Sequence, residues 1–168
     1  SASTTIGNKV TGSGNVSASI TGTSSILTVN SDLDLTAGTI NLASDNNLTV
    51  AAKLATTSTG ANAIVLNAGR STAAGTASGG NIVFSGTPNV SVGASGRVSL
   101  FTGSVSGSTG VTALVGSGSG NFRYGSDENG DPNVDYELFD EGDYGMEVNI
   151  YVDDFYRAIE AKLREKNT

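Results

Sequence analysis

Apolar residues recur two positions apart in short segments along the first 122 residues. Each segment has the length of a strand and is bounded by Gly, Asn, Ser or Asp. This alternation predicts short β-strands, each with one face turned toward a core. The predicted strands cover residues 26–29, 33–35, 40–42, 48–50, 64–66, 82–84, 90–92 and 98–101.

The spacing of these segments predicts how the strands are arranged. Their first apolar positions fall at 26, 33, 40 and 48, and again at 82, 90, 98 and 105. Three strands therefore take about 22 residues, a repeat typical of a β-solenoid in which each strand pairs with its equivalent one coil later. Residues 54–62 and 69–80 are predicted as loops that leave the stack, and the remaining length predicts about five coils. A β-sandwich is the alternative, since its strands recur every 8–12 residues, but a step of seven to eight leaves little room for hairpin loops.

Composition divides the chain near residue 122. Residues 1–122 carry four basic and three acidic side chains, a net charge of +1, whereas residues 123–168 carry five basic and thirteen acidic ones, a net charge of −8. All five tyrosines also lie after residue 122. We therefore predict a Ser/Thr/Gly-rich solenoid over 1–122, an acidic linker or calcium loop over 123–145, and a strand plus helix over 146–168.

Several functions are disfavoured by the residues that the chain lacks. It has no His, Cys or Trp, so an imidazole base, a thiolate nucleophile and a zinc or iron–sulfur site with soft ligands are all excluded. The net charge of −7 disfavours binding to nucleic acid. No run approaches the roughly 18 apolar residues that a membrane-spanning helix needs. The sequence therefore predicts that the protein is not an enzyme, needs no cofactor other than a possible calcium ion, does not bind nucleic acid and has no membrane span.

Several polar stretches resemble a known class of proteins. The stretches 66–69, 75–82, 85–88 and 100–104, together with Gly116–Glu128 as the most specific one, are similar to filamentous-haemagglutinin-type bacterial exoproteins, especially those with YDG-type repeats. The likeness covers about residues 20–128. It implies a right-handed β-helix, secretion or a place on the bacterial cell surface, and a role in adhesion or in surface fibres. It brings no catalytic residues.

The acidic segment that follows has an oxygen-bearing side chain at every second position. Its start is similar to EF-hand and dockerin-like calcium loops, in which alternate side chains converge on one hard cation. However, Pro132 replaces the glycine of the sharp turn, and Leu138 stands where the bidentate glutamate belongs. A solvated acidic linker is therefore the alternative. The candidate calcium ligands are Asp127, Asn129, Asp131, Asn133, Asp135 and Glu137.

Two features of the first part offer less specific chemistry. Asp32 and Asp34 are two residues apart, which could begin the acidic cluster of a polysaccharide-cleaving β-helix, but only Asp45 adds a further carboxylate, so turn capping is the preferred role. Thr28 and Thr49 are one coil apart, as a threonine ladder on an ice-binding face would require, but no third member follows them.

The C-terminal segment predicts a strand over 147–152 and a helix that runs to about residue 166. Phe155, Ile159 and Leu163 recur every four residues and form one apolar stripe. That stripe predicts either an end cap for the solenoid or a docking surface for another subunit. Tyr124, Tyr136, Tyr144 and Tyr151 are candidates for a contact surface.

The sequence as a whole predicts a non-catalytic extracellular module that acts as a stalk or adhesive surface. Its partners would be other protein subunits or a host or cell-surface protein or glycan. A self-assembling filament subunit, joined end to end by β-strand addition, is the main alternative. A calcium-stabilised carbohydrate-binding module is a weaker one.

Overall fold

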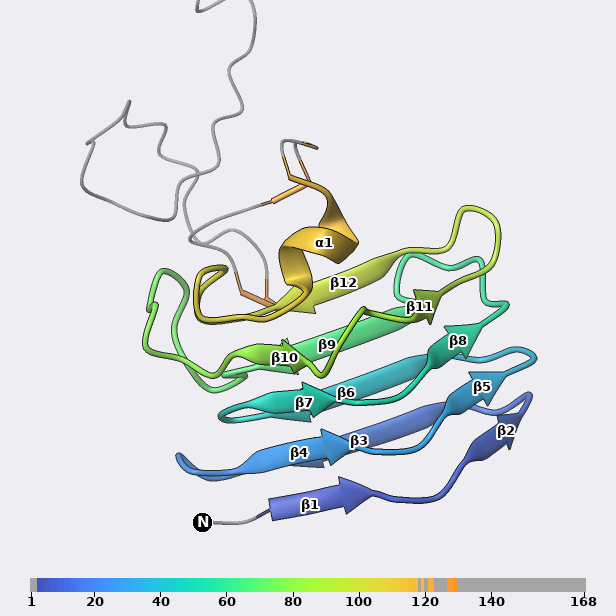
Figure 1. Cartoon of the computed structure of the whole chain (residues 1–168), viewed down its shortest axis with the longest axis horizontal. Coiled ribbons are helices and arrows are strands. Elements are labelled where there is room, and N and C mark those ends of the chain that lie inside the picture. The colour runs from blue at the N-terminus through green and yellow to red at the C-terminus, as the bar shows by residue number, and fades with distance from the viewer. Residues whose placement is uncertain (1–2, 118, 120, 123–126, 130–168) are drawn as a thin grey trace, which may run out of the picture.

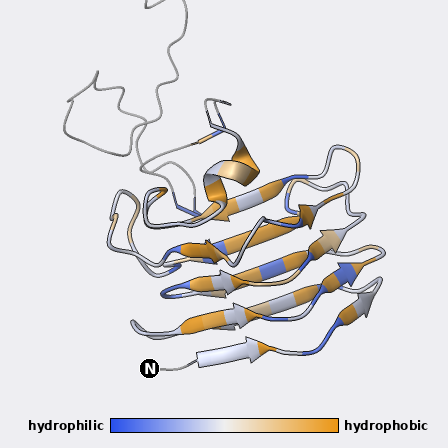
Figure 2. Cartoon of the chain, viewed as in Figure 1, coloured by the Kyte–Doolittle hydropathy of each residue, from blue (hydrophilic) through white to orange (hydrophobic). Residues whose placement is uncertain are grey.

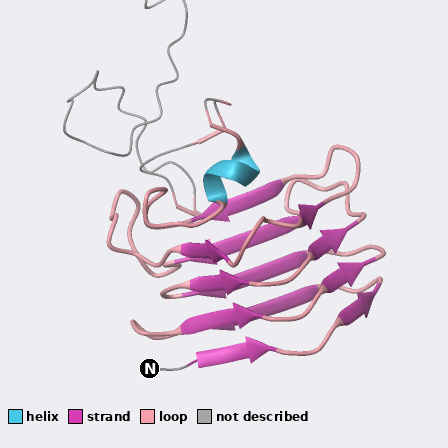
Figure 3. Ribbon diagram, viewed as in Figure 1, coloured by secondary structure: helices cyan, strands magenta, loops and turns pink. Residues whose placement is uncertain are grey.

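The computed structural model describes residues 3–117, 119, 121–122 and 127–129. These residues form three parallel four-stranded sheets and one short helix (Figures 1 and 3). The chain visits the three sheets in turn, so each passage around the core adds one strand to each sheet (Figure 1). The elements are β1 (Ser3–Ile6), β2 (Val10–Gly12), β3 (Val16–Ile20), β4 (Ile26–Val29), β5 (Leu33–Leu35), β6 (Ile40–Ser44), β7 (Leu48–Val50), β8 (Leu54–Thr56), β9 (Ile64–Ala68), β10 (Ile82–Phe84), β11 (Val90–Ser91), β12 (Val98–Phe101) and α1 (Val111–Val115).

The register confirms the predicted solenoid-like stacking of parallel strands. Leu27 pairs with Leu48, and Leu33 pairs with Leu54, both 21 residues apart, whereas Ile40 pairs with Ile64, 24 residues on. Pairing at a near-constant separation, always parallel, excludes the β-sandwich, whose sheets are antiparallel. Strands are assigned to four passages, and Thr109 begins a fifth by bridging Val83.

A narrow core of aliphatic side chains runs along the axis of the stack. In β4, β5 and β7 the alternate residues point inward and are buried, as the predicted period of two requires. Figure 2 shows the resulting hydrophobic bands on successive strands. The residues that are fully shielded from solvent, at 0% exposure, include Leu27, Val29, Leu33, Ile40, Leu42, Leu48, Leu54, Ile64, Leu66 and Ile82.

The first passage is less well covered than the second. Ile6, Val10 and Val16 point toward the core but are only half-buried. Their register partners in the second passage are all fully buried. Among the described residues, β1, β2 and β3 are edge strands of their sheets (Figure 1).

Four described strands were missed by the apolar pattern. The strands β1, β2 and β3 consist largely of Ser, Thr and Gly, so few apolar residues mark their inward positions. The strand β8 lies inside the predicted loop 54–62, where Ala55 and Thr56 hide the alternation. In these strands, pairing with a neighbouring passage determines the structure more than intrinsic preference does.

The opposite end of the stack also differs from prediction. Val105 was expected to begin a strand, but it lies in a turn, and Thr109 makes the next pairing instead. The unpredicted helix α1 follows and lies over that end of the stack (Figure 1). Its Val111 is buried, and Leu114 packs against the core. This helix therefore covers part of the C-terminal end of the apolar core.

Polar side chains at the corners fix each passage to the next. The Oδ1 atom of Asn15 accepts a hydrogen bond from the backbone N–H of Thr39, at 2.9 Å. Asn47 does the same for the backbone N–H of Asn81, at 2.8 Å. These bonds satisfy backbone donors at corners, where no ladder partner is available. Asparagine at a corner thus aligns successive passages.

Candidate functional site: a groove at one corner of the stack

The groove arises because one corner of the stack changes length. Residues 30–32 and 51–53 connect the first sheet to the second in two successive passages, with three residues each. The corresponding connection in the next passage, residues 85–89, has five. The main-chain hydrogen bonds on either side are kept, with Ser85 N donating to Val50 O and Leu54 N donating to Asn89 O, both at 2.9 Å. The two extra residues therefore bulge outward and leave a hollow beside the shorter corner.

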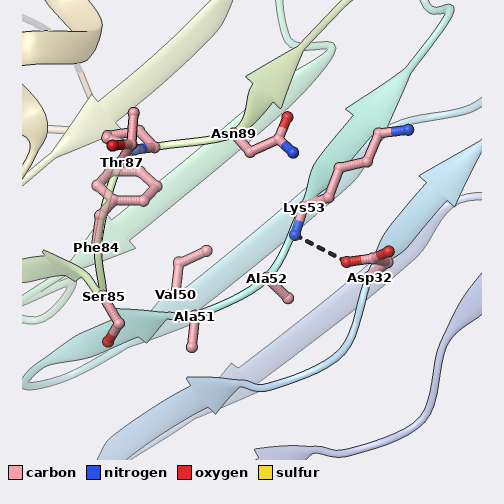
Figure 4. A pocket seen from close by; sticks show the side chains of 10 residues that line it. Asp32, Val50, Ala51, Ala52, Lys53, Phe84, Ser85, Thr87 and Asn89 are labelled. Carbon is pink, nitrogen blue, oxygen red and sulfur yellow. Dashed lines mark hydrogen bonds between the residues drawn. The ribbon is translucent and has the colours of Figure 1, made fainter.

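This corner groove is lined by residues from three passages (Figure 4). Its volume is about 270 Å³, close to the lower end of the roughly 300–1,000 Å³ range of small-molecule pockets. Its inner side is apolar and its outer side is polar. The lining consists of Asp32, Val50, Ala51, Ala52, Lys53, Phe84, Ser85, Thr87, Pro88 and Asn89.

The charged groups of the groove are held in place by defined contacts. The Oδ1 atom of Asp32 accepts a hydrogen bond from the backbone N–H of Lys53, at 3.0 Å (Figure 4). The Lys53 ammonium lies 3.0 Å from Oδ2 of Asp34 on β5. Both side chains of this ion pair are about one-third exposed, at 34% and 37%, so the pair adds little stability. It does fix the one ammonium group beside the groove.

The preferred role of Asp32 is therefore confirmed, since its carboxylate caps the corner of the next passage. Asp34 pairs with a lysine, and Asp45 lies at a different corner, where it bonds to Gly22. The three carboxylates thus have separate partners.

Asp45 is the centre of a second polar cluster, on another side of the stack. Its Oδ2 accepts a hydrogen bond from the backbone N–H of Gly22 at 2.8 Å, and its Oδ1 accepts one from Ser71 Oγ at 2.8 Å. The Arg70 guanidinium lies 3.3 Å from the same Oδ1 and also donates to Ser19 Oγ, at 2.6 Å. The hydrogen bond from Gly22, then that from Ser71, and the positive charge of Arg70 lower the pKa of Asp45 below its usual 3.8. The cluster ties the start of the loop that follows β9 to the two earlier passages.

This arrangement predicts a pH dependence for stability. Because the folded-state pKa of Asp45 lies below its unfolded value, its contribution is complete above pH 4 to 5 and is lost as pH falls through the folded pKa. At pH 6 we expect Asp45→Asn to lower the free energy of unfolding by about 1 kcal/mol. Urea unfolding of both proteins from pH 6 to pH 2 should show this difference shrinking below about pH 4. A difference that stays constant over the whole range would contradict the assignment.

A threonine ladder extends further than the sequence indicated. The register places Thr5, Thr28 and Thr49 in line on the first sheet, followed by Val83 and Thr109. The expectation that the ladder has only two threonines was therefore wrong. The first member was missed because Ser3–Ile6 was not recognised as a strand. Val83 interrupts the line, and the outward residue Ile26, one step along β4, is 36% exposed.

Most candidate residues of the C-terminal part lie outside the described residues. Asp127 and Asn129 are described, and the backbone N–H of Asn129 donates to Oδ1 of Asp127 at 2.8 Å. The other candidates are Asp131, Asn133, Asp135 and Glu137 for calcium, Phe155, Ile159 and Leu163 for docking, and Tyr124, Tyr136, Tyr144 and Tyr151 for contact. All of these stay predictions.

The groove itself was missed by sequence reasoning. The available signal was the two-residue lengthening between the predicted strands 82–84 and 90–92, which contains Thr87 and Pro88. Its meaning depends on the corner below it, 34 to 36 residues earlier. A pattern within one segment could not show that the two corners stack.

Comparisons with protein-family models, curated proteins and solved structures found no match to this chain. Within the part of the chain that the structure describes, no three His, Cys, Asp or Glu side chains are grouped as a metal site would need. No helix among the described residues is both long enough and apolar enough to cross a membrane.

Proposed function

We propose that this chain is a non-catalytic, extracellular module of a bacterial surface or secreted protein, and that it serves as a rigid adhesive stalk. The observation that carries the proposal is the in-register parallel stack around a dry aliphatic core. Such a stack gives a stiff rod, because each passage is held to the next by a ladder of backbone hydrogen bonds and by buried side chains. We further propose that the rod is a right-handed solenoid of about five coils, since parallel crossover connections are right-handed in about 98% of cases.

The outer surface of the rod supports a binding role. Residues 3–122 contain only four basic and three acidic side chains, and their outward positions are mostly Ser, Thr, Asn and Ala. The connections after β8 and β9 leave the stack, while the next passage pairs in register on both strands (Figure 1). Side chains in such loops can vary without loss of the core, and exposed loops on a rigid scaffold often carry recognition.

An adhesion assay tests this function. Micrometre-sized beads coated with the full chain should be retained on epithelial-cell monolayers under flow more strongly than beads coated with albumin. Beads coated with heat-unfolded chain provide the matched control for non-specific stickiness. Retention equal to both controls would refute the adhesive role, whatever the fold.

A filament subunit is the second candidate function. The half-buried core residues of β1, β2 and β3 favour it, because a further strand on each of these edges would bury them. Either a second molecule or another passage of a longer chain could supply such strands. Uniform fibres in negative-stain electron microscopy would support the filament, and single particles alone would refute it. Loss of fibres in excess chelator would further assign the calcium ligands proposed over 127–137.

A further inference from the structure

The exposed side of the corner groove consists of uncharged hydrogen-bonding groups. Ser85, Thr87 and Asn89 are all exposed. Asn47 and Asn81 use their side chains to hold the next passage. By contrast, no side-chain hydrogen bond joins Ser85, Thr87 or Asn89 to any other residue that the structure describes. Two hydroxyl groups and one amide at this corner are thus available to a ligand.

The inner side of the groove offers an apolar surface but no aromatic face. Val50 and Phe84 are both only 2% exposed, so they form the base on which Ala52 and Pro88 rest, both half-buried. A flat aromatic ligand could not stack on the buried ring of Phe84. A small ligand with one apolar face could instead lie against Ala52 and Pro88.

Charge argues against an anionic ligand. Lys53 is the one basic residue of the lining, and its ammonium is paired with Asp34 at 3.0 Å. Asp32 adds a carboxylate whose Oδ1 is engaged by the backbone N–H of Lys53. The second oxygen of Asp32 can accept a further hydrogen bond from a hydroxyl group. A phosphate, sulfate or carboxylate would meet a net negative charge here.

These features together fit one chemical class. A pyranose ring has hydroxyl groups around its edge and a face of C–H bonds, and a volume of about 270 Å³ leaves room for one such ring. We propose that the corner groove binds a single neutral sugar residue of a glycan, through Asp32, Ser85, Thr87 and Asn89. This inference rests on the proposed adhesive function and gives that function a ligand class. Because the groove is open on one side, we expect a dissociation constant in the millimolar range, about 1–10 mM.

Chemical-shift mapping by NMR tests this site directly. The ¹⁵N-labelled full chain would be titrated separately with D-glucose, D-galactose, D-mannose and N-acetylglucosamine, up to about 50 mM. The proposal expects saturable shifts from at least one of the four, concentrated in the amides of 51–53, 85–87 and 89. Sorbitol, an acyclic polyol, and inorganic phosphate serve as control titrants and should not produce these shifts.

Variants show whether the named side chains make the contacts. Asn89→Ala should weaken binding about fivefold, the loss expected for one hydrogen bond. The substitution spares the fold, because the bond from Leu54 N goes to the backbone carbonyl of Asn89. Asn41→Ala is the matched control, since Asn41 is an exposed asparagine on β6, outside the groove lining, and its affinity should stay that of the original chain.

Three results would overturn the proposal. They are no saturable shift at the groove with any of the four sugars, equal shifts with sorbitol, and undiminished affinity in Asn89→Ala. The bead assay separates this inference from the proposed function. If Asn89→Ala beads adhere as strongly as the original while sugars leave the groove unshifted, adhesion stands and the sugar site fails. If no beads adhere but a sugar saturates the groove, the site stands and the adhesive role fails.

Discussion

Replacing Leu42 with Ala should lower the free energy of unfolding by about 2–5 kcal/mol. Leu42 is fully buried on β6, with Ala18 as its register partner on one side and Leu66 on the other. A core only one side chain deep between three sheets has few neighbours that can move into the space left by a leucine. The cost should therefore include most of the cavity term as well as the lost transfer free energy.

Urea unfolding followed by circular dichroism measures this effect. The matched control is Asn41→Ala, the preceding residue on the same strand, whose side chain is exposed. Its effect should stay within about 0.5 kcal/mol. Equal effects of the two substitutions would show that Leu42 does not face the core.

The second large effect is expected at Gly80, where even one added methyl group has no room. Gly80 is buried, and a Cβ at this position would overlap the backbone carbonyl of Asn46 in the previous passage. The obstacle is main chain held by its own ladder, so a side-chain rotation cannot relieve the clash. We expect Gly80→Ala to cost about 3 kcal/mol, near the upper end of overpacking penalties.

Gly7→Ala is the control for Gly80→Ala. Gly7 has no atom within 4 Å of the position that a Cβ would take, and its φ angle is not positive. Its substitution should change stability by no more than about 0.5 kcal/mol. A small effect at Gly80 would mean that residues 69–81 do not pack against the corner at Asn46 as described.

The sequence predicted the strands whose inward positions are all large and aliphatic. Leu27 and Val29 on β4, like Leu48 and Val50 on β7, show the period of two directly, and their separation of 21 residues reveals the coil. Prediction failed where the strand consists of small polar residues, as in Ser3–Ile6. Such segments become strands because a neighbouring ladder offers hydrogen bonds, and that information lies some 23 residues away.

The sites were predicted less well than the fold for a related reason. The role of Asp32 in capping a corner followed from its residue type and its place beside a turn. The groove, in contrast, depends on a difference in length between two corners that meet only when the passages stack. The partners of Asp45 are also distant in sequence, at Gly22 on one side and Arg70 on the other. No local motif marks such contacts.

Disulfide trapping tests the parallel register most directly, and the absence of native cysteine makes it clean. Thr28 and Thr49 are register partners on adjacent parallel strands. Their Cα atoms should be about 4.8 Å apart, within the range that a disulfide spans. In the offset pair Thr28 and Ala51 the second cysteine lies two residues further along, so the Cα separation should be about 8 Å, beyond that range.

Both double-cysteine variants would be oxidised under mild conditions, and intramolecular disulfide would be quantified by mass spectrometry of the intact and digested monomer. The described register predicts rapid, nearly complete cross-linking of Thr28→Cys/Thr49→Cys and little of Thr28→Cys/Ala51→Cys. Equal cross-linking of the two pairs, or a preference for the offset pair, would contradict the parallel stacked fold on which every other inference depends.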